Sequence, residues 1–242
     1  MKTRLLCMAV LASAAGFAQA QASGGDAPRS NDPLEPYNRA MFGFNEALDS
    51  ALLAPLARGY VNVVPELVRT GVSNVLGNFG DVWSAFNQML QGKGEAAATM
   101  TARVATNTLF GLGGLFDVAS DLGMERQSED FGQTLGRWGL PAGAYFVWPV
   151  LGPSTIRDTA GRPLDLAWSP TRLTDHELTR YSISGLQLLD TRAGLLGASR
   201  VVDGIALDKY TFIRDAYIAR RRSLVYDGDP PGEPADPEPA PK

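Results

Sequence analysis

Few residues of this 242-residue chain have the types and spacing that enzyme chemistry requires. The chain contains one histidine, His176, and one cysteine, Cys7. A lone histidine cannot form a cluster of metal ligands, and no motif places a serine beside it, so a surface position is the better interpretation. The neighbouring acids Glu129 and Asp130 are typical of a helix N-terminus, where negative charge is stabilising. The sequence therefore predicts no catalytic residue, no cofactor and no metal site.

A glycine-rich segment at 109–116 is the next candidate for binding. It reads Leu-Phe-Gly-Leu-Gly-Gly-Leu-Phe. This pattern matches neither G-x-G-x-x-G nor the P-loop, and it lacks the P-loop lysine. Large apolar side chains flank the glycines, which is unfavourable for phosphate. We interpret the segment as a place where the backbone approaches an apolar surface closely, or where a helix bends, which suits a path for lipid.

The segment 138–156 is apolar and carries no charged side chain. Its length alone would allow a membrane span, but three prolines break any helix there and remove backbone donors, which lipid does not tolerate. An interfacial or re-entrant segment fits better, with aromatic rings at headgroup level. A buried irregular hairpin is the alternative. The residues predicted to lie at a membrane interface are Tyr145, Phe146, Trp148, Val150 and Leu151.

The N-terminus has the features of a cleavable export signal. Two cations precede an uncharged apolar run at 5–17, and Ala-Gln-Ala at 18–20 resembles a signal-peptidase site. We expect a signal at 1–20 and a flexible tether at 21–31. Loss of the two cations would change the formal net charge from -4 to -6, since the signal contains no acid. This charge excludes a generally basic nucleic-acid binder.

The rest of the chain is expected to form one helical domain at 32–226 and a tail at 227–242. The tail contains six prolines and five acids, so it cannot bury enough apolar surface to offset its ordering entropy, and we predict that it is disordered. Period-two alternation is scarce in the domain, whereas apolar residues recur at steps of three and four, which predicts an all-α fold. The expected boundaries are a start at Pro36, an end at Pro55, a second start at Pro65, a third helix capped by Asp81 and ended by Gly92, and helices over 95–109 and 204–226.

Two charge patterns have ordinary interpretations. Glu35 and Arg39 are four residues apart, which predicts an ion pair on one helix face. The three arginines at 220–222 predict a solvated face rather than a site for anionic headgroups. Neither pattern points by itself to a ligand.

A set of short motifs, taken in order, resembles the MlaA family of the Gram-negative outer membrane, also called VacJ. The resemblance covers roughly 32–226. It is the ordered set that is specific, since each motif alone is short. The matching motifs are Asp32-Pro33-Leu34-Glu35, Asn38-Arg39, Phe44-Asn45, Gly77-Asn78, Asn107-Thr108, Gly111-Leu112-Gly113-Gly114, Phe116-Asp117-Val118-Ala119, Phe131-Gly132-Gln133-Thr134-Leu135-Gly136, the segment 149–158, Leu189-Asp190-Thr191-Arg192-Ala193 and Arg214-Asp215-Ala216-Tyr217.

The resemblance implies a ring-like bundle of amphipathic helices in the periplasmic leaflet of the outer membrane. Its implied partners are outer-membrane phospholipids, a trimeric porin and a soluble periplasmic lipid carrier of the MlaC type. The implied function is non-enzymatic transport that removes mislocalised phospholipids from the outer leaflet and maintains lipid asymmetry. Residues expected to form the lipid path or gate are Phe44, Asn45, Gly111, Leu112, Gly113, Gly114, Leu115 and Phe116.

The N-terminus departs from the family pattern. Family members are typically lipoproteins acylated on a cysteine at the end of the apolar run, whereas Cys7 precedes most of that run and Arg4 stands where a lipobox has an aliphatic residue. We therefore expect no acylation at Cys7, and retention through apolar surface and porin contacts instead. Two other functions remain open from the sequence: a scaffold for porins, and a periplasmic hydrolase acting on lipid or peptidoglycan.

Overall fold

The computed structural model describes residues 32–231. Its contacts divide the chain into two units, Met1–Pro33 and Leu34–Lys242, and every described helix and strand lies in the second unit. In chain order these elements are α2 (Glu35–Leu48), the π-helix η1 (Asp49–Leu53), α3 (Ala54–Val63), α4 (Glu66–Leu90), α5 (Gly94–Leu109), α6 (Val118–Asp121), α7 (Phe131–Arg137), β1 (Tyr145–Trp148), β2 (Gly152–Thr155), α8 (Ile156–Ala167), the 3-10 helix η2 (Pro170–Leu173), α9 (Glu177–Gly194), α10 (Leu196–Ile205) and α11 (Lys209–Val225).

Some sequence predictions fall outside the described residues. The expected signal at 1–20, the tether at 21–31 and most of the tail at 227–242 are among them. They stay predictions, as does the proposed boundary of the helical domain.

The first three elements follow one another without a break in the helical backbone. α2 has Pro36 in its first turn, as predicted. The prediction that Pro55 ends this helix is wrong, because α3 continues to Val63. The π-helical turn η1 comes immediately before α3, and Pro55 lies in the first turn of α3. A proline is tolerated there, since the first backbone N–H groups of a helix have no intrahelical partner.

α4 is one long helix where two were predicted. Asp81 does not cap a helix, because it lies within α4 and is only 1% exposed. Its carboxylate is 3.0 Å from Nε of Arg126 and 3.5 Å from Nε of Arg103. Pairing with two guanidinium groups makes a buried acid tolerable within the helix, so the capping signal was misleading. Gly92, with φ +76°, follows the helix end as predicted.

The C-terminal helices are interrupted. The helix predicted over 204–226 is not continuous, whereas α5, earlier in the chain, confirms the helix predicted over 95–109. α10 ends at Ile205, and α11 begins after Asp208, whose side chain accepts hydrogen bonds from the backbone N–H groups of Tyr210 and Thr211. Such an N-cap supplies partners for orphan donors, and it fixes a new helix start.

The segment 138–156 contains a regular β-hairpin. β1 pairs with β2 in antiparallel register, with Tyr145 opposite Thr155 and Trp148 opposite Gly152. In the described part of the chain these are the only two strands, and the remaining elements are helical, so the all-α class is confirmed. Within residues 32–231 no helix has both the length and the apolar character needed to cross a membrane.

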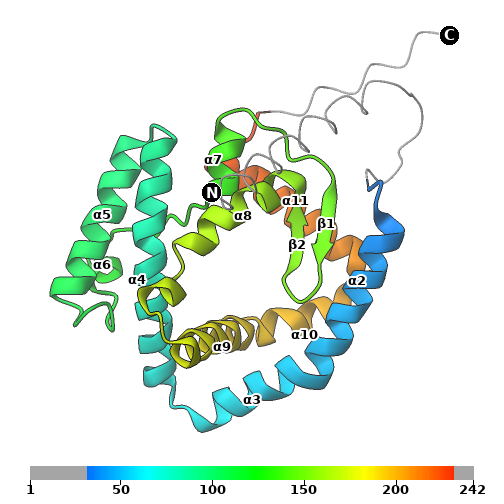
Figure 1. Ribbon diagram of the computed structural model, residues 1–242, viewed down its shortest axis with the longest axis horizontal. Helices are drawn as coiled ribbons and strands as arrows, with labels where there is room; N and C mark the ends of the chain where they lie inside the picture. Colours follow the sequence, from blue (N-terminus) through cyan, green and yellow to red (C-terminus); the bar gives the residue numbers. More distant parts are fainter. Residues whose placement is uncertain (1–31, 232–242) are drawn as a thin grey trace. The chain divides into compact units, whose positions relative to one another are not determined.

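Contacts between elements of the second unit close a circuit. α3 packs on α9, α9 on α4, α4 on α7, α7 on α8 and α8 on β2, and β1 then contacts α2. α11 packs on both α7 and β2. Figure 1 shows α5 and α6 on the side of α4 that faces away from this circuit. The circuit agrees with the ring-like bundle that the family resemblance implied.

Polar side chains make up much of the buried interior. One small apolar cluster contains Tyr145, Val147 and Tyr210, with Met41, Phe42 and Tyr217 packed against it. Elsewhere Asn38 and Arg103 are fully buried, at 0% exposure. Since burial of a polar group is costly unless it is hydrogen-bonded, these side chains fix their neighbours in position.

Candidate functional site

The glycine-rich segment joins α5 to α6 through a tight turn. The backbone N–H of Gly113 donates to the carbonyl of Thr108 at 3.0 Å, and that of Gly114 donates to the carbonyl of Asn107 at 2.8 Å. Leu112, Gly113 and Gly114 all have positive φ, at 52°, 73° and 93°. A leucine in this left-handed region is strained, and such strain persists only where the surroundings impose it. The turn is therefore a defined structure and not a free loop.

Large apolar side chains extend from this turn into solvent. Leu109 and Phe110 are each 73% exposed, and Leu112 is 72% exposed. On the other side the turn lies against α4, since a Cβ on Gly114 would approach Cβ of Asn78 to 2.9 Å. The segment thus has one face held by the protein and one apolar face left open.

A buried ion network fixes the end of this segment. Arg103 is 0% exposed, and its Nη2 lies 2.9 and 3.0 Å from the two carboxylate oxygens of Asp117. Burial alone would raise the pKa of Asp117, but hydrogen bonds from Ser120, Asn107 and Arg103 lower it to about 2. Asp117 also caps α6 by accepting from the backbone N–H of Ser120. The carboxylate is therefore held in its charged form at the point where the glycine-rich segment ends.

An apolar groove runs beside the glycine-rich segment. Its volume is about 560 Å³, and it lies between the N-terminal half of α4, the end of the glycine-rich segment, η2 and α9. A groove with this lining would accept hydrocarbon and reject a charged group. Its lining residues are Leu67, Val68, Thr70, Gly71, Val72, Asn74, Val75, Leu76, Phe79, Leu115, Phe116, Pro170, Ile183 and Leu186.

Two asparagines of α2 hold the hairpin. Asn38 donates to the carbonyl of Tyr145 at 3.1 Å and accepts from the N–H of Val147 at 2.9 Å, so its amide acts as a partner for the free edge of β1. Asn45 does the same at the turn, donating to the carbonyl of Trp148 at 2.9 Å and accepting from the N–H of Val150 at 2.7 Å. Asn45, predicted as a lipid-path residue, thus bonds to the hairpin.

The residues predicted to lie at a membrane interface separate into two groups. Tyr145 is 2% exposed and belongs to the apolar core, so its predicted place at a surface is wrong. Alternation along the strand points it inward, together with Val147. Phe146 is partly buried and stacks on Tyr37, and the partly buried Trp148 contacts it edge-on. Val150 and Leu151 form the exposed turn, at 48% and 56% exposure.

The turn itself is strained at Val150, which has φ +67°. A β-branched residue in the left-handed region is a genuine outlier, and the hydrogen bond from its N–H to Asn45 helps to impose it. Phe44, adjacent to Asn45, is 50% exposed. The hairpin turn and the glycine-rich turn therefore share a pattern, in which a strained, polar-anchored backbone presents exposed apolar side chains.

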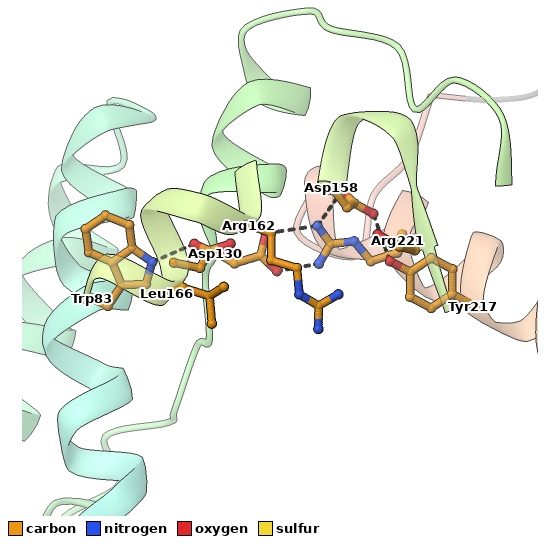
Figure 2. A pocket seen from close by; sticks show the side chains of 9 residues that line it. Trp83, Asp130, Asp158, Arg162, Leu166, Tyr217 and Arg221 are labelled. Atoms are coloured by element: carbon orange, nitrogen blue, oxygen red, sulfur yellow. Dashed lines mark hydrogen bonds and ion pairs between the residues drawn. The ribbon is translucent and has the colours of Figure 1, made fainter. Parts of the chain in front are cut away.

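A polar cleft of about 370 Å³ lies where α4, α7, β2, α8 and α11 meet (Figure 2). At its centre Arg221 donates to Asp130 at 2.5 Å and to Asp158 at 2.8 Å. Asp158 also accepts from the hydroxyl of Tyr217 at 2.9 Å. Burial alone would raise the pKa of Asp158, but Arg221, Arg157 and the hydroxyl of Tyr217 together outweigh burial, and the pKa is lowered. The prediction that the arginines at 220–222 form a solvated face is therefore wrong for Arg221.

Asp165 and Arg162 also line this cleft, from the same helix. Oδ1 of Asp165 accepts from Nε1 of Trp83 and from the backbone N–H of Phe131, both at 2.8 Å. Burial raises the pKa of Asp165. Arg162 makes no hydrogen bond or ion pair with any residue in 32–231. Figure 2 shows its side chain extending away from Asp130 and Asp158.

The acids predicted to mark a helix N-terminus form ion pairs or cap a helix, and the single histidine lies apart from them. Glu129 pairs with Lys93 at 3.1 Å and accepts from Gln91 at 2.9 Å, while Asp130 caps α7, as predicted for a helix N-terminus. His176 is exposed at the start of α9. Among the residues that the structure describes, no group of three or more His, Cys, Asp and Glu side chains could hold a metal ion.

Comparisons with known proteins decide the family. The family model described as MlaA lipoprotein matches residues 30–224. This chain belongs to the MlaA lipoprotein family. The intermembrane phospholipid transport system lipoprotein MlaA of Haemophilus influenzae is 34% identical over 206 residues, which span 82% of this chain and 80% of that protein. The Escherichia coli protein of the same name is 32% identical over 219 residues, spanning 86% and 83%.

A solved structure agrees with the MlaA assignment. It is described as "Structural basis for maintenance of bacterial outer membrane lipid asymmetry", and its chain is 32% identical to this one with a TM-score of 0.71. The match covers 80% of this chain and 98% of that chain. The family predicted from the ordered motifs is thus confirmed in both sequence and fold.

In this MlaA-family chain the predicted path residues do not form one site. Leu115 and Phe116 line the apolar groove, while the glycines preceding them form the strained turn. Phe44 and Asn45 lie at the hairpin instead. Sequence reasoning missed Arg162 and the acid three residues after it, although their spacing on a helix was a signal that they share a face.

Proposed function

We propose that this chain is a non-enzymatic phospholipid transport component that removes mislocalised phospholipids from the outer leaflet of the outer membrane and so maintains lipid asymmetry. The observation that carries the proposal is family membership over residues 30–224, together with relatives named as intermembrane phospholipid transport lipoproteins. The solved structure at TM-score 0.71 concerns the same process. The assignment of a transport role and not an enzymatic one rests on that family.

The apolar groove and the polar cleft supply the two environments that a phospholipid needs. The apolar groove at Leu115 and Phe116 is suited to acyl chains, because it lets hydrocarbon leave water. The polar cleft around Arg221 offers charged and hydrogen-bonding groups suited to a headgroup. A protein that sorts lipid by environment requires both, and it requires no bond to be broken.

Association with the inner leaflet of the outer membrane is supported by apolar side chains on the outer helices. Phe44, Leu52 and Leu56 are 50%, 49% and 50% exposed, and they recur at multiples of four along α2, η1 and α3. A stripe of this kind can lie in the headgroup–acyl boundary without crossing the bilayer. The exposed Val150 and Leu151 extend the apolar surface at the hairpin turn.

We propose a trimeric porin and a soluble periplasmic lipid carrier of the MlaC type as protein partners. The porin would hold the chain at the outer membrane, and the carrier would receive the phospholipid. Retention by these contacts matters most if Cys7 is not acylated, as its poor lipobox predicts. Cys7 lies outside the described residues.

Transport is tested by gene deletion and complementation. Deletion should leave phospholipid in the outer leaflet and make cells sensitive to detergent with EDTA. Leu115→Asp, which places a charge in the apolar groove, should fail to complement, whereas Leu122→Asp, at a residue 65% exposed and outside the groove, should complement fully. Unchanged outer-leaflet lipid in the deletion strain would refute the transport role and leave the porin scaffold as the better account.

Membrane association and acylation need separate measurements. Mass spectrometry of the mature N-terminus should find cleavage after Ala20 and no lipid on the chain. Fractionation should place the wild type with the outer membrane. Replacing both Val150 and Leu151 with aspartate should shift the protein toward the soluble fraction, because it places two charges on an exposed apolar turn. A mature N-terminus with an acylated cysteine would contradict the expected mode of retention.

A further inference from the structure

The polar cleft contains one cation that the fold itself does not neutralise. Arg162 lines the cleft and is partly buried, yet no residue in 32–231 forms an ion pair or hydrogen bond with its side chain. Arg221 in the same cleft is paired with Asp130 and Asp158. A guanidinium is a fork of donors suited to phosphate or carboxylate oxygens. Arg162 is thus available to an anion that enters the cleft.

An acid with one unused oxygen lies three residues further along α8. Asp165 uses Oδ1 for both of its hydrogen bonds, with Trp83 and Phe131. Oδ2 accepts no hydrogen bond from the described part of the chain. The carboxylate is therefore oriented by the protein through one oxygen, and the other is left for a donor.

The spacing of these two groups is the key observation. Residues three apart on a helix are neighbours on one face, with Cβ atoms about 5–6 Å apart. Arg162 and Asp165 both line the cleft, and no ion pair between them is present in residues 32–231. An anion-binding fork and a cation-binding oxygen thus extend from one face of α8 into the same cleft without forming an ion pair with each other.

Most of the other charged and polar lining groups are already paired. Asp130 and Asp158 share Arg221, and Oδ2 of Asp158 accepts from Tyr217. The hydroxyl of Ser154 lies 3.1 Å from that of Thr159. These contacts make a polar wall. Besides the buried Nε of Arg221, which has no hydrogen-bond partner in residues 32–231, they leave Arg162 and Asp165 as the lining groups with free capacity.

We infer that this cleft binds a phosphate that carries an ammonium group two carbons away, the phosphoethanolamine headgroup. The phosphate would lie on Arg162, and the ammonium would donate to Oδ2 of Asp165. This site rests on the proposed transport function and gives it a headgroup preference. A phosphoglycerol headgroup offers hydroxyl donors but no cation, so the negative charge of the acid beside its phosphate would stay uncompensated.

The walls of the cleft fit the part of the lipid next to the headgroup. Leu166 follows the acid along α8, and the indole of Trp83 lies at the same end of the cleft (Figure 2). Trp83 stacks on Phe86 and Trp168, with ring centroids 5.4 and 5.3 Å away, and the latter two are 39% and 56% exposed. Exposed aromatic rings of this kind favour the headgroup–acyl boundary.

The test measures which lipid the purified protein retains. Full-length mature protein is incubated with detergent micelles containing equal amounts of phosphatidylethanolamine and phosphatidylglycerol, repurified, and its bound lipids are quantified by mass spectrometry. The wild type should retain the ethanolamine lipid over the glycerol lipid by about tenfold, the effect expected of one charge-assisted hydrogen bond. Equal retention of both lipids by the wild type would overturn the inference.

Two substitutions separate the two ends of the site. Arg162→Gln should lower retention of both lipids by about tenfold, since both carry the phosphate. Asp165→Asn should abolish the preference, while its carbonyl oxygen still accepts from Trp83 and Phe131. Arg58→Gln is the matched control, because Arg58 is exposed on α3, outside the cleft, and is also unpaired among the described residues. Lipid retention by Arg162→Gln equal to that of the control would overturn the phosphate assignment.

Soluble competitors distinguish a headgroup site from a simple phosphate site. Phosphoethanolamine should displace the ethanolamine lipid more effectively than inorganic phosphate. Equal displacement by the two would overturn the role of the ammonium, and displacement by neither would place recognition in the acyl chains and overturn the site. Failure of the proposed function looks different, since the wild type would then retain lipid without clearing the outer leaflet in cells.

Discussion

The ion network at the end of the glycine-rich segment gives the sharpest prediction. Asp117→Asn removes the negative charge that faces Arg103, which is 0% exposed, while an asparagine oxygen can still cap α6. In the wild type, two arginines and two aspartates balance in this cluster, namely Arg103, Arg126, Asp81 and Asp117. Loss of one acid leaves a buried guanidinium short of a partner. Such a loss costs about 3 kcal/mol of the free energy of unfolding.

The matched control is Asp121→Asn, on the same short helix but at an exposed position without a partner in the described residues. It should change the free energy of unfolding by less than about 0.5 kcal/mol. Urea unfolding at pH 7, followed by circular dichroism, measures both variants. If Asp117→Asn costs no more than the control, the reasoning that this buried network fixes the segment is refuted.

The pH dependence of the same pair is an independent check. The pKa of Asp117 is about 2 in the folded protein, below its value of about 3.9 in an unfolded chain. A carboxyl with a lowered folded pKa contributes stability above the unfolded pKa, and that stability is lost as the pH falls through the folded value. The stability difference between wild type and Asp117→Asn should therefore persist from pH 7 to about pH 4 and shrink only below it. A difference already lost at pH 5 would contradict the network.

Four further predictions concern the free energy of unfolding and use the same assay. Asn45→Ala should lower the free energy of unfolding by about 2 kcal/mol, because it removes two hydrogen bonds that hold the hairpin turn. Val150→Gly should raise the free energy of unfolding by about 0.5 kcal/mol, since it relieves the strain of a valine at φ +67°. Gly113→Ala should lower the free energy of unfolding by about 1 kcal/mol, because the position has positive φ. Gly114→Ala should lower it by about 2 kcal/mol, because that position has positive φ and its new Cβ would also press against α4. Asp165→Asn should be neutral within about 0.5 kcal/mol, because burial raises the pKa of this carboxyl and its charge does not stabilise the fold; a loss as large as that of Asn45→Ala would contradict this.

Local signals were sufficient where the residues that carry them have a single local interpretation. The helix over 95–109 and the stop at Gly92 follow from propensity and from a residue that tolerates positive φ, and both were found. The signals at Pro55 and Asp81 were misread, because each also has an interpretation that depends on distant structure. A proline fits the first turn of a helix as well as its end, and an aspartate fits a buried ion pair as well as a cap.

The polar cleft could not be predicted from the sequence because its members come from distant parts of the chain. Arg221 stands between two other arginines, and a run of three cations indicates a solvated face. Successive residues on a helix point about 100° apart, so one of three can face inward while its neighbours do not. Which one does so depends on Asp130 and Asp158, which lie 91 and 63 residues away in the sequence.

The two turns predicted to meet lipid share a physical design that explains why their apolar side chains can stay exposed. An exposed apolar turn without other support tends to collapse onto the nearest apolar surface, since burial is favourable. Here asparagines anchor the hairpin turn, and the pair Arg103–Asp117 anchors the glycine-rich turn, so neither backbone depends on its apolar side chains for its position. The side chains of Val150 and Leu112 are thereby free to contact something outside the protein, while the strained backbone beneath them stays fixed. Loss of an anchor should therefore cost stability first, whereas loss of an exposed apolar side chain should cost membrane contact first.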